Sequence, residues 1–296
     1  MTTFLDQAIA AIAAGVLGVL ASLPAPPPGG PPAEQPPASA TRPSLPPQTT
    51  PEPSGGSVVG HDISWPNCPV GMGIPARRTL GLPLPPASSR FVVIGLTNGP
   101  AFYANPCLSL QVAHARRNNI WMSAYAVVTY PTPDQLRAYG GVGPKSGSGL
   151  ADRLWNTGWA QARLNVSNMR VAGLRSPVLW LDVEPVRPPA PWSGDPVANR
   201  IVLEGSMAAY RQAGLRLGVY STPYLWRTVV GDVDYGLPEW RAAGPTSKQQ
   251  ALRQCAGDSI QGGPPVLAQW VEEIDTNVLC PGVPAADVLS EFFTPG

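Results

Sequence analysis

One stretch constrains the fold more than any other: residues 177–185, which read Pro-Val-Leu-Trp-Leu-Asp-Val-Glu-Pro. Its opening residues are apolar, as in a strand of a parallel sheet that is covered on both faces. Side chains alternate along a strand, so Asp182 and Glu184 are predicted to point to the same side. Pro185 has no N–H for a ladder hydrogen bond, so strand pairing is expected to end there. The two acids are therefore predicted at the carboxyl end of a buried strand, where parallel α/β folds place their chemistry.

Strand-like and helix-like segments alternate along residues 58–296. Strand patterns are predicted at 61–66, 91–96, 121–128, 177–182, 215–220, 238–243 and 266–271, and helical patterns at 107–119, 151–174, 198–213 and 225–230. Residues 131–150 are rich in Gly, Pro and Ser and are predicted to form a loop. The alternation is typical of a mostly parallel sheet. Seven or eight strands in roughly 240 residues favour closure, so the predicted fold class is α/β, a modified (β/α) barrel of the TIM type.

The N-terminal part of the chain differs in composition from the rest. Residues 8–23 form an uncharged apolar run, shorter than the ~20 residues of a membrane span but suited to the core of a secretory signal. The residues before it include Asp6 and no Lys or Arg, so retention as an anchor, or burial as a helix, stays open. Residues 24–57 carry almost no large apolar residue and many prolines, which predicts a disordered, extended linker.

This organisation predicts three parts: a signal peptide or membrane anchor at 1–23, a linker at 24–57 and a barrel domain at 58–296. We therefore expect a protein that is secreted or associated with the cell envelope, with a possible N-terminal membrane tether. The formal net charge is +1 and charged residues make up 13% of the chain. Without a basic excess, binding to nucleic acid through counterion release is not expected.

The cysteines agree with export. Four are present, Cys68, Cys107, Cys255 and Cys280, with no CxxC, and the two histidines are His61 and His114. A Cys/His zinc site needs tighter spacing, so no metal site and no cofactor are predicted, and both histidines are expected to be structural. Four cysteines allow three pairings. We favour Cys68–Cys107 with Cys255–Cys280, because each closes a modest loop, and four free thiols remain the alternative.

Three strand patterns are expected to end in acids: Asp62, then Asp182 with Glu184, then Asp275. The first and last strands of a closed barrel are neighbours, so these carboxyl groups are predicted to meet at one mouth. Several acids in a cleft suit glycoside hydrolysis, in which one carboxyl donates a proton to the leaving oxygen and another stabilises or attacks the oxocarbenium-like centre. Mutual repulsion raises the pKa of at least one of them. Taken singly, each acid also suits a turn or a helix cap.

These motifs resemble glycoside hydrolase family 25, the lysozymes of the Chalaropsis type. Asp62-Ile63-Ser64-Trp65 looks like its opening D-x-S-x-W strand, and Asp182-Val183-Glu184 looks like its D-x-E signature. Gly218-Val219-Tyr220-Ser221 is similar to G-x-Y-S, residues 238–242 to P-x-W-x-A, and Asp275-Thr276-Asn277 to the closing D-x-N. Asn105-Pro106-Cys107 and the four-cysteine pattern resemble a family-25-like group of secreted actinobacterial proteins.

The resemblance implies a barrel that cleaves the β-1,4 bond between N-acetylmuramic acid and N-acetylglucosamine. It implies Glu184 as general acid and Asp182 as the assisting carboxylate, which orients the acetamido group of the substrate. Asp62 and Asp275 would tune charge and hold substrate, and Tyr220 would line the floor. Two motifs depart from the family: residues 123–126 read Ser-Ala-Tyr-Ala where Tyr-His-Phe is usual, and residues 268–270 read Ala-Gln-Trp where Trp-Gln-Tyr is usual.

Aromatic side chains can form sugar platforms. Trp180 lies mid-strand and is predicted to be core, whereas the remaining candidates for substrate contact are Tyr125, Trp65, Gln269 and Trp270, with Trp240 as a further aromatic. The first hypothesis is an exported muramidase-like glycosidase that acts, as a monomer, on a cell-wall polysaccharide, namely peptidoglycan. Two alternatives stay open: a catalytically inactive wall-binding module on the same barrel, and a hydrolase of another polysaccharide such as an arabinogalactan-type glycan.

Overall fold

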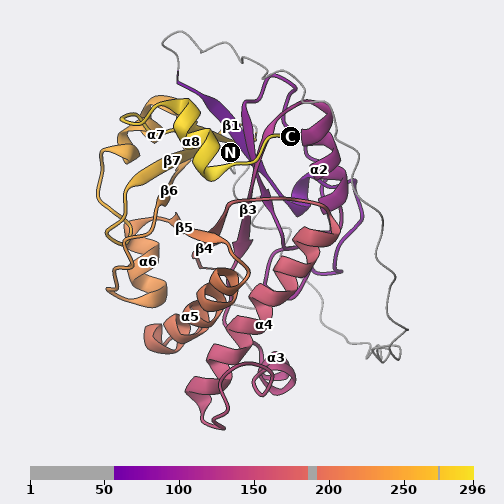
Figure 1. The fold of residues 1–296 in the computed structure, drawn as a ribbon, viewed down its shortest axis with the longest axis vertical. Helices are drawn as coiled ribbons and strands as arrows, with labels where there is room; N and C mark the ends of the chain where they lie inside the picture. The colour runs from indigo at the N-terminus through magenta and orange to yellow at the C-terminus, as the bar shows by residue number, and fades with distance from the viewer. Residues whose placement is uncertain (1–56, 186–191, 273) are drawn as a thin grey trace, which may run out of the picture.

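The computed structural model describes residues 57–185, 192–272 and 274–296, and shows a closed barrel of eight strands (Figure 1). The strands are β1 (Val59–Ile63), β2 (Phe91–Gly95), β3 (Trp121–Val127), β4 (Val178–Asp182), β5 (Arg216–Ser221), β6 (Glu239–Pro245), β7 (Pro265–Val271) and β8 (Asp275–Leu279). The predicted α/β barrel is thereby confirmed. The predicted signal or anchor at 1–23 and nearly all of the linker at 24–57 lie outside the described residues.

One strand of the barrel runs against the others. Strands β1 to β7 pair with their sequence neighbours in parallel, whereas β8 closes the barrel between β7 and β1 and is antiparallel to both. The expectation that a strand ends in Asp275 is wrong, because Asp275 is the first residue of β8. Since β8 runs in the opposite direction, its first residue lies at the same end of the barrel as the last residues of the parallel strands.

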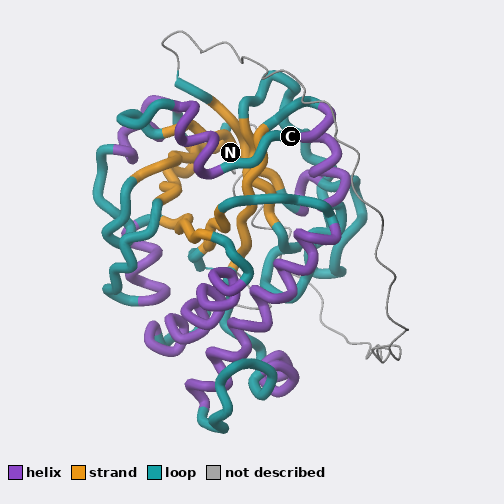
Figure 2. Tube along the Cα trace, in the orientation of Figure 1, coloured by secondary structure: helices purple, strands orange, loops and turns teal. Residues whose placement is uncertain are grey.

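Helices cover the outside of the barrel, except the last one, which packs on side chains inside it (Figures 1 and 2). They are α2 (Leu108–Arg117), α3 (Pro133–Tyr139), α4 (Leu150–Val171), α5 (Pro196–Gln212), α6 (Pro223–Val230), α7 (Lys248–Cys255) and α8 (Ala285–Phe292). The loop predicted at 131–150 contains α3, because Thr132 caps this helix. The hydroxyl of Thr132 accepts from the backbone N–H of Gln135, and the backbone N–H of Thr132 donates to the side-chain oxygen of Gln135. Helices α7 and α8 were also missed.

Two hydrophobic layers hold the barrel together. An outer layer packs the helices on the strands, with Leu154 of α4, Leu203 of α5 and Ile94 of β2 almost fully buried. An inner layer fills the half of the barrel where the parallel strands begin, and there Phe292 of α8 stacks on Trp180 with ring centroids 5.7 Å apart. Trp180 has no exposed surface, which confirms it as core. One end of the barrel is thus filled with apolar side chains.

The two disulfides have the predicted local pairing, Cys68–Cys107 and Cys255–Cys280. The first joins the segment after β1 to the start of α2, and the second joins the end of α7 to the residue after β8. Each therefore fixes an outer element against the barrel. None of the helices in the described part of the chain is long and apolar enough to cross a bilayer.

Candidate active site

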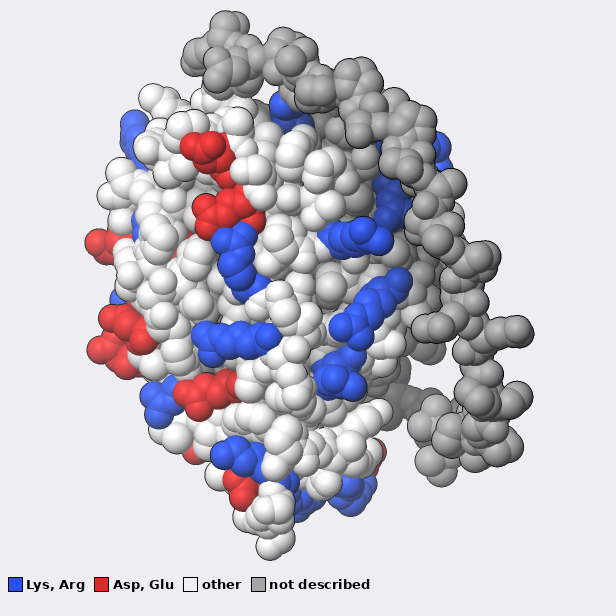
Figure 3. Space-filling model, viewed as in Figure 1, with Lys and Arg blue, Asp and Glu red and all other residues white. Residues whose placement is uncertain are grey.

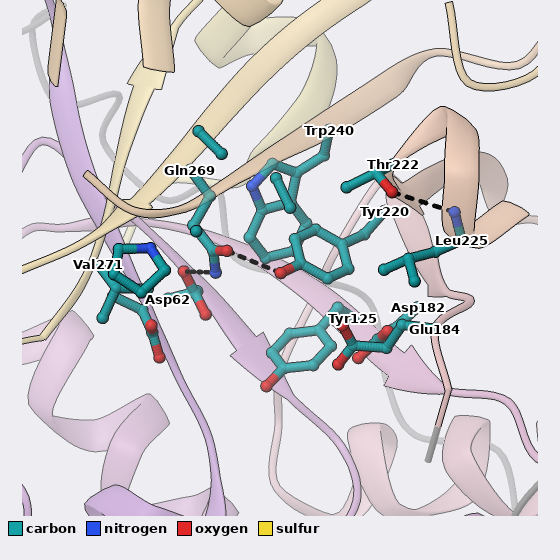
Figure 4. A pocket seen from close by; sticks show the side chains of 15 residues that line it. Asp62, Tyr125, Asp182, Glu184, Tyr220, Thr222, Leu225, Trp240, Gln269 and Val271 are labelled. Carbon is teal, nitrogen blue, oxygen red and sulfur yellow. Dashed lines mark hydrogen bonds between the residues drawn. The ribbon is translucent and has the colours of Figure 1, made fainter. Parts of the chain in front are cut away.

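A hollow of about 570 Å³ opens at the end of the barrel where the parallel strands finish (Figure 4). The filled opposite end supports its floor. The side chains around it come from seven strands, β1 and β3 to β8, and the segments that follow them. They are Asp62, Tyr125, Asp182, Glu184, Tyr220, Thr222, Leu225, Trp240, Ala242, Ala243, Gly244, Pro245, Gln269, Val271 and Asp275.

Strand geometry explains why four carboxyl groups meet there. Asp182 is the last residue of β4, and Glu184 follows two residues later, so both point inward as the alternation predicted. Asp62 points inward from β1, and Asp275 joins them through the reversed direction of β8. The structure therefore brings together all four acids that the sequence placed at a common mouth.

The acids raise one another's affinity for protons. Burial, followed by the charge of Asp62, raises the pKa of Glu184 to about 7. Burial and then the charges of Glu184 and Asp62 raise the pKa of Asp182 well above its usual range. Burial also raises the pKa of Asp275, with Asp62 and Glu184 contributing. Like charges in a site of low dielectric cannot all ionise at neutral pH, so the hollow holds protons that it can donate.

Asp62 differs from the other three acids in its hydrogen bonds. Its Oδ1 accepts from Gln269 Nε2 at 2.9 Å and from Asn277 Nδ2 at 2.7 Å. Burial raises the pKa of Asp62 to about 6, although these two donors oppose the rise. By contrast, the buried Oδ1 of Asp182 has no hydrogen-bond partner among the described residues, which leaves an unsatisfied polar atom in a residue that lines the hollow.

Three aromatic rings form the floor of the hollow. The Trp240 ring lies 4.5 Å from that of Tyr220 and 5.7 Å from that of Tyr125, measured between centroids. The register places Tyr220 directly between Asp182 on β4 and Trp240 on β6. Burial raises the pKa of both tyrosines well above 10, so their hydroxyls remain neutral donors. Such a floor suits the apolar faces of a sugar ring.

Two predicted substrate contacts lie elsewhere. Trp270 is 3% exposed and sits on the outer side of β7, where it packs with Ala251 of α7 and donates to Glu272. The alternation of β7 explains this, because Gln269 takes the inward position and its neighbour must face out. Trp65 lies in a short 3-10 helix, Trp65–Asn67, and does not line the hollow. The prediction that Trp65 and Trp270 contact substrate is therefore wrong.

Several lining residues had no signal in the sequence. Leu225 lies in the first turn of α6, and Val271 is the last residue of β7. Residues 242–245 of β6 line one side of the hollow with small side chains. Apolar and small residues at a rim look like ordinary core or turn residues in a sequence. Thr222 had a weak signal, since the Ser-Thr-Pro turn after β5 is where Thr222 caps α6. In the sequence, nothing distinguishes Trp240 from the other aromatic candidates.

The histidines lie outside the hollow. His61 pairs through Nδ1 with the hydroxyl of Ser89 at 2.8 Å, and His114 contacts the carbonyl of Pro85 at 2.9 Å, which are structural roles. Across residues 57–185, 192–272 and 274–296, no three His, Cys, Asp or Glu side chains are grouped in a way that could hold a metal ion. The face drawn in Figure 3 carries acidic and basic side chains scattered over a surface that is largely uncharged.

Comparisons with known proteins point to one group. Residues 152–245, which include Asp182, Glu184 and Trp240, match the family model described as Lysozyme-like protein 1. Lysozyme-like protein 5 of Caenorhabditis elegans is 31% identical over 75 residues, which are 25% of this chain and 33% of that protein. The alignment thus spans a third of that relative's length.

Solved structures share the barrel. A muramidase from Acremonium alcalophilum superposes with a TM-score of 0.51 and 19% identity, covering 79% of this chain and 98% of that chain. A bacterial lysozyme from Streptomyces coelicolor gives 0.51 and 19%, covering 80% and 98%. A family 25 glycosyl hydrolase from Bacillus anthracis gives 0.50 and 13%, covering 79% and 92%. At these identities the likeness is one of fold. The chain therefore resembles the lysozyme-like proteins in sequence over residues 152–245 and has the barrel fold of glycoside hydrolase family 25.

Proposed function

We propose that this protein is a glycoside hydrolase that cleaves β-1,4 bonds in cell-wall peptidoglycan, with Glu184 as general acid and Asp182 as the assisting carboxylate. The observation that carries the proposal is the gathering of four carboxyl groups in one hollow, where the pKa of Glu184 is raised to about 7. An acid catalyst works best when its pKa lies near the working pH, because it then both holds and releases its proton. The lysozyme and muramidase folds of its structural neighbours support the same reaction.

The geometry supports a division of labour among the acids. Protonated Glu184 donates its proton to the glycosidic oxygen as the bond to the anomeric carbon breaks, and the leaving sugar departs as an alcohol. Asp182 lines the hollow beside Glu184 and accepts a hydrogen bond from an acetamido N–H of the substrate. Ionised Asp62 stabilises the positive charge that develops on the sugar ring, and Asp275 holds substrate. Water then attacks the anomeric carbon and returns a proton to Glu184.

The setting proposed for this reaction is the cell envelope. Two disulfides within the folded part suit an oxidising compartment outside the cytoplasm. We propose that residues 1–23 direct export, either as a cleaved signal or as a retained tether, and that residues 24–57 space the barrel from that end. A wall polysaccharide is the proposed partner, bound by a monomer.

The test compares the full chain with its Glu184→Gln variant on purified peptidoglycan, with release of reducing ends as the readout. We expect the variant to lose roughly 10²–10⁴-fold in rate, which is the usual contribution of general acid catalysis. Glu291→Gln is the matched control, because Glu291 is exposed on α8 at the opposite end of the barrel. Equal release by wild type and Glu184→Gln would overturn the catalytic role.

Two further measurements separate the alternatives. If the wild-type protein binds insoluble cell wall saturably but releases no reducing ends, the protein is a wall-binding module on the same barrel and not an enzyme. A panel of soluble glycans, including an arabinogalactan, identifies a different polysaccharide substrate if peptidoglycan is left intact and another glycan is cleaved.

A further inference from the structure

A chain of hydrogen bonds runs beneath the hollow and ends on Asp62. Trp240 Nε1 donates to Asn277 Oδ1 at 2.7 Å, and Asn277 Nδ2 donates to Asp62 Oδ1 at 2.7 Å. Trp240 is 1% exposed, and Asn277 has no exposed surface. These three residues come from β6, β8 and β1, so the chain forms only when the barrel closes.

The direction of this chain is fixed by its first member. An indole N–H can only donate, so Asn277 must turn its carbonyl oxygen toward Trp240 and its amino group toward Asp62. The oxygen of Asp62 that faces Asn277 must therefore accept. An ionised carboxylate accepts at both oxygens, and this arrangement favours that form.

A second branch reaches the same oxygen. The hydroxyl of Tyr220 donates to Gln269 Oε1 at 2.7 Å, and Gln269 Nε2 donates to Asp62 Oδ1 at 2.9 Å; Figure 4 shows Gln269 between the two. Gln269 is 6% exposed and both ends of its amide are engaged within the protein. It is therefore placed to orient Asp62, in addition to lining the hollow.

The charge on Asp62 matters because of what surrounds it. The titratable groups that face it across the hollow are Tyr125 from β3, Asp182 from β4, Glu184 from the segment after β4, Tyr220 from β5 and Asp275 from β8. Strands β6 and β7 contribute Trp240 and Gln269, which do not titrate. No lysine, arginine or histidine is among the described residues lining the hollow. A negative charge on Asp62 is thus opposed by no cation there and acts directly on the neighbouring acids.

We propose that Asn277, oriented by Trp240 and assisted by Gln269, is a positioning residue that keeps Asp62 ionised, and that this fixed charge makes Glu184 retain its proton near neutral pH. The inference rests on the proposed function only in giving Glu184 the role of acid. Asn277 does not touch the hollow and acts through Asp62. The raised pKa of Glu184, to which Asp62 contributes after burial, supports the coupling.

The experiment measures carboxyl titrations directly by carbon NMR of the full chain, so that it does not depend on turnover. In Asn277→Leu the donor is lost, which favours neutral Asp62; the pKa of Asp62 should rise and that of Glu184 should fall, each by roughly one pH unit. Asp62→Asn should lower the pKa of Glu184 by a similar amount. Adding Asn277→Leu to Asp62→Asn should move Glu184 no further, because the charge through which Asn277 acts is already gone.

The activity arm separates this inference from the proposed function. If Glu184 is the acid, the alkaline limb of the kcat/KM profile should shift to lower pH in Asn277→Leu by the same amount as the NMR value. A merely structural role would lower activity at every pH and leave the limb in place. A Glu184→Gln variant with wild-type activity would remove the proposed function, while the NMR cycle would still decide the coupling.

Trp240→Phe tests the same hydrogen-bond chain if the buried Asn277→Leu variant fails to fold. It keeps an aromatic ring but removes the N–H that orients Asn277, so it should shift Glu184 in the same direction by a smaller amount. The inference is overturned if Asn277→Leu and Trp240→Phe leave the Glu184 titration unchanged, or if Asn277→Leu shifts it equally with and without Asp62.

Discussion

A buried ion pair on the outer side of β6, the strand that carries Trp240 of the active site, allows a quantitative test of what stabilises the barrel. Arg241 Nη2 and Nε lie 2.7 and 2.8 Å from Glu239 Oε2, and Glu239 is fully buried. Arg241 Nη1 also donates to the carbonyls of Gln254 and Gly257 at the end of α7. Because side chains alternate on β6, this pair faces outward while Trp240 between them faces the hollow.

Arg241→Met is predicted to lower the free energy of unfolding by about 3 kcal/mol. Removing one partner of a buried pair costs about 3–5 kcal/mol, because the remaining charge stays buried. The lower end applies here, since Glu239 Oε1 still accepts from Ser259 Oγ and from the backbone N–H groups of Gln261 and Gly263. For a fold of this size, about 3 kcal/mol corresponds to roughly 6–12 °C in Tm.

The assay is thermal and denaturant unfolding of the full chain at several pH values. Arg137→Met is the control, because its partner Asp134 and Arg137 itself are largely exposed and such pairs contribute about 0.5 kcal/mol or less. Burial alone raises the pKa of Glu239, but hydrogen bonds from Ser259, the backbone of residues 260–261 and Arg241 outweigh it and leave the pKa lowered.

The sign of the pH dependence follows from that lowered pKa. A group with a lowered pKa stabilises the fold above its unfolded pKa, and this contribution is lost as pH falls through the folded pKa. Arg241→Met weakens this contribution, so the stability gap between wild type and variant should be widest near neutral pH and should narrow in acid. A loss no greater than that of Arg137→Met, or a gap that stays constant on acidification, would refute the reasoning.

Two further predictions concern the site and the helix layer. Glu184→Gln should have a higher free energy of unfolding than wild type at pH 8, by at most about 3 kcal/mol, and this difference should vanish toward pH 4.5. The reason is that the pKa of Glu184 is raised from 4.5 to about 7, so its ionisation destabilises the wild-type fold as pH rises between these values. Unfolding measured at both pH values checks this, and a difference that stays constant would contradict it. Gly158→Ala should lower the free energy of unfolding by about 1–3 kcal/mol through overpacking, since a Cβ there would meet the carbonyl oxygen of Val202 on α5. Gly141→Ala is the control, because the space around Gly141 is open and stability should change little. Equal melting temperatures for the two variants would count against a tight α4–α5 contact.

Local patterns in the sequence were sufficient for the parallel part of the barrel and for the acid pair. The apolar run before Asp182, the two-residue spacing to Glu184 and the following Pro185 are short-range features, and strand alternation alone turns both acids the same way. The local cysteine pairing also followed from loop length. Helices α3, α7 and α8 escaped prediction because short helices depend on caps and on packing against the barrel more than on their own periodicity.

Tertiary structure decided everything that depends on closure of the barrel. The antiparallel direction of β8 put the first residue of that strand, Asp275, at the mouth, and alternation on β7 sent Trp270 outward while Gln269 faced Asp62. The residues of a single strand do not show whether it pairs in parallel or antiparallel, or which of its two faces lies inside the barrel, because both depend on the neighbouring strands. The sequence by itself therefore determined which acids are present and which of them lie at or beside strands. Only the folded barrel decided which of them are hydrogen-bonded, which are repelled, and hence which of them hold a proton at neutral pH.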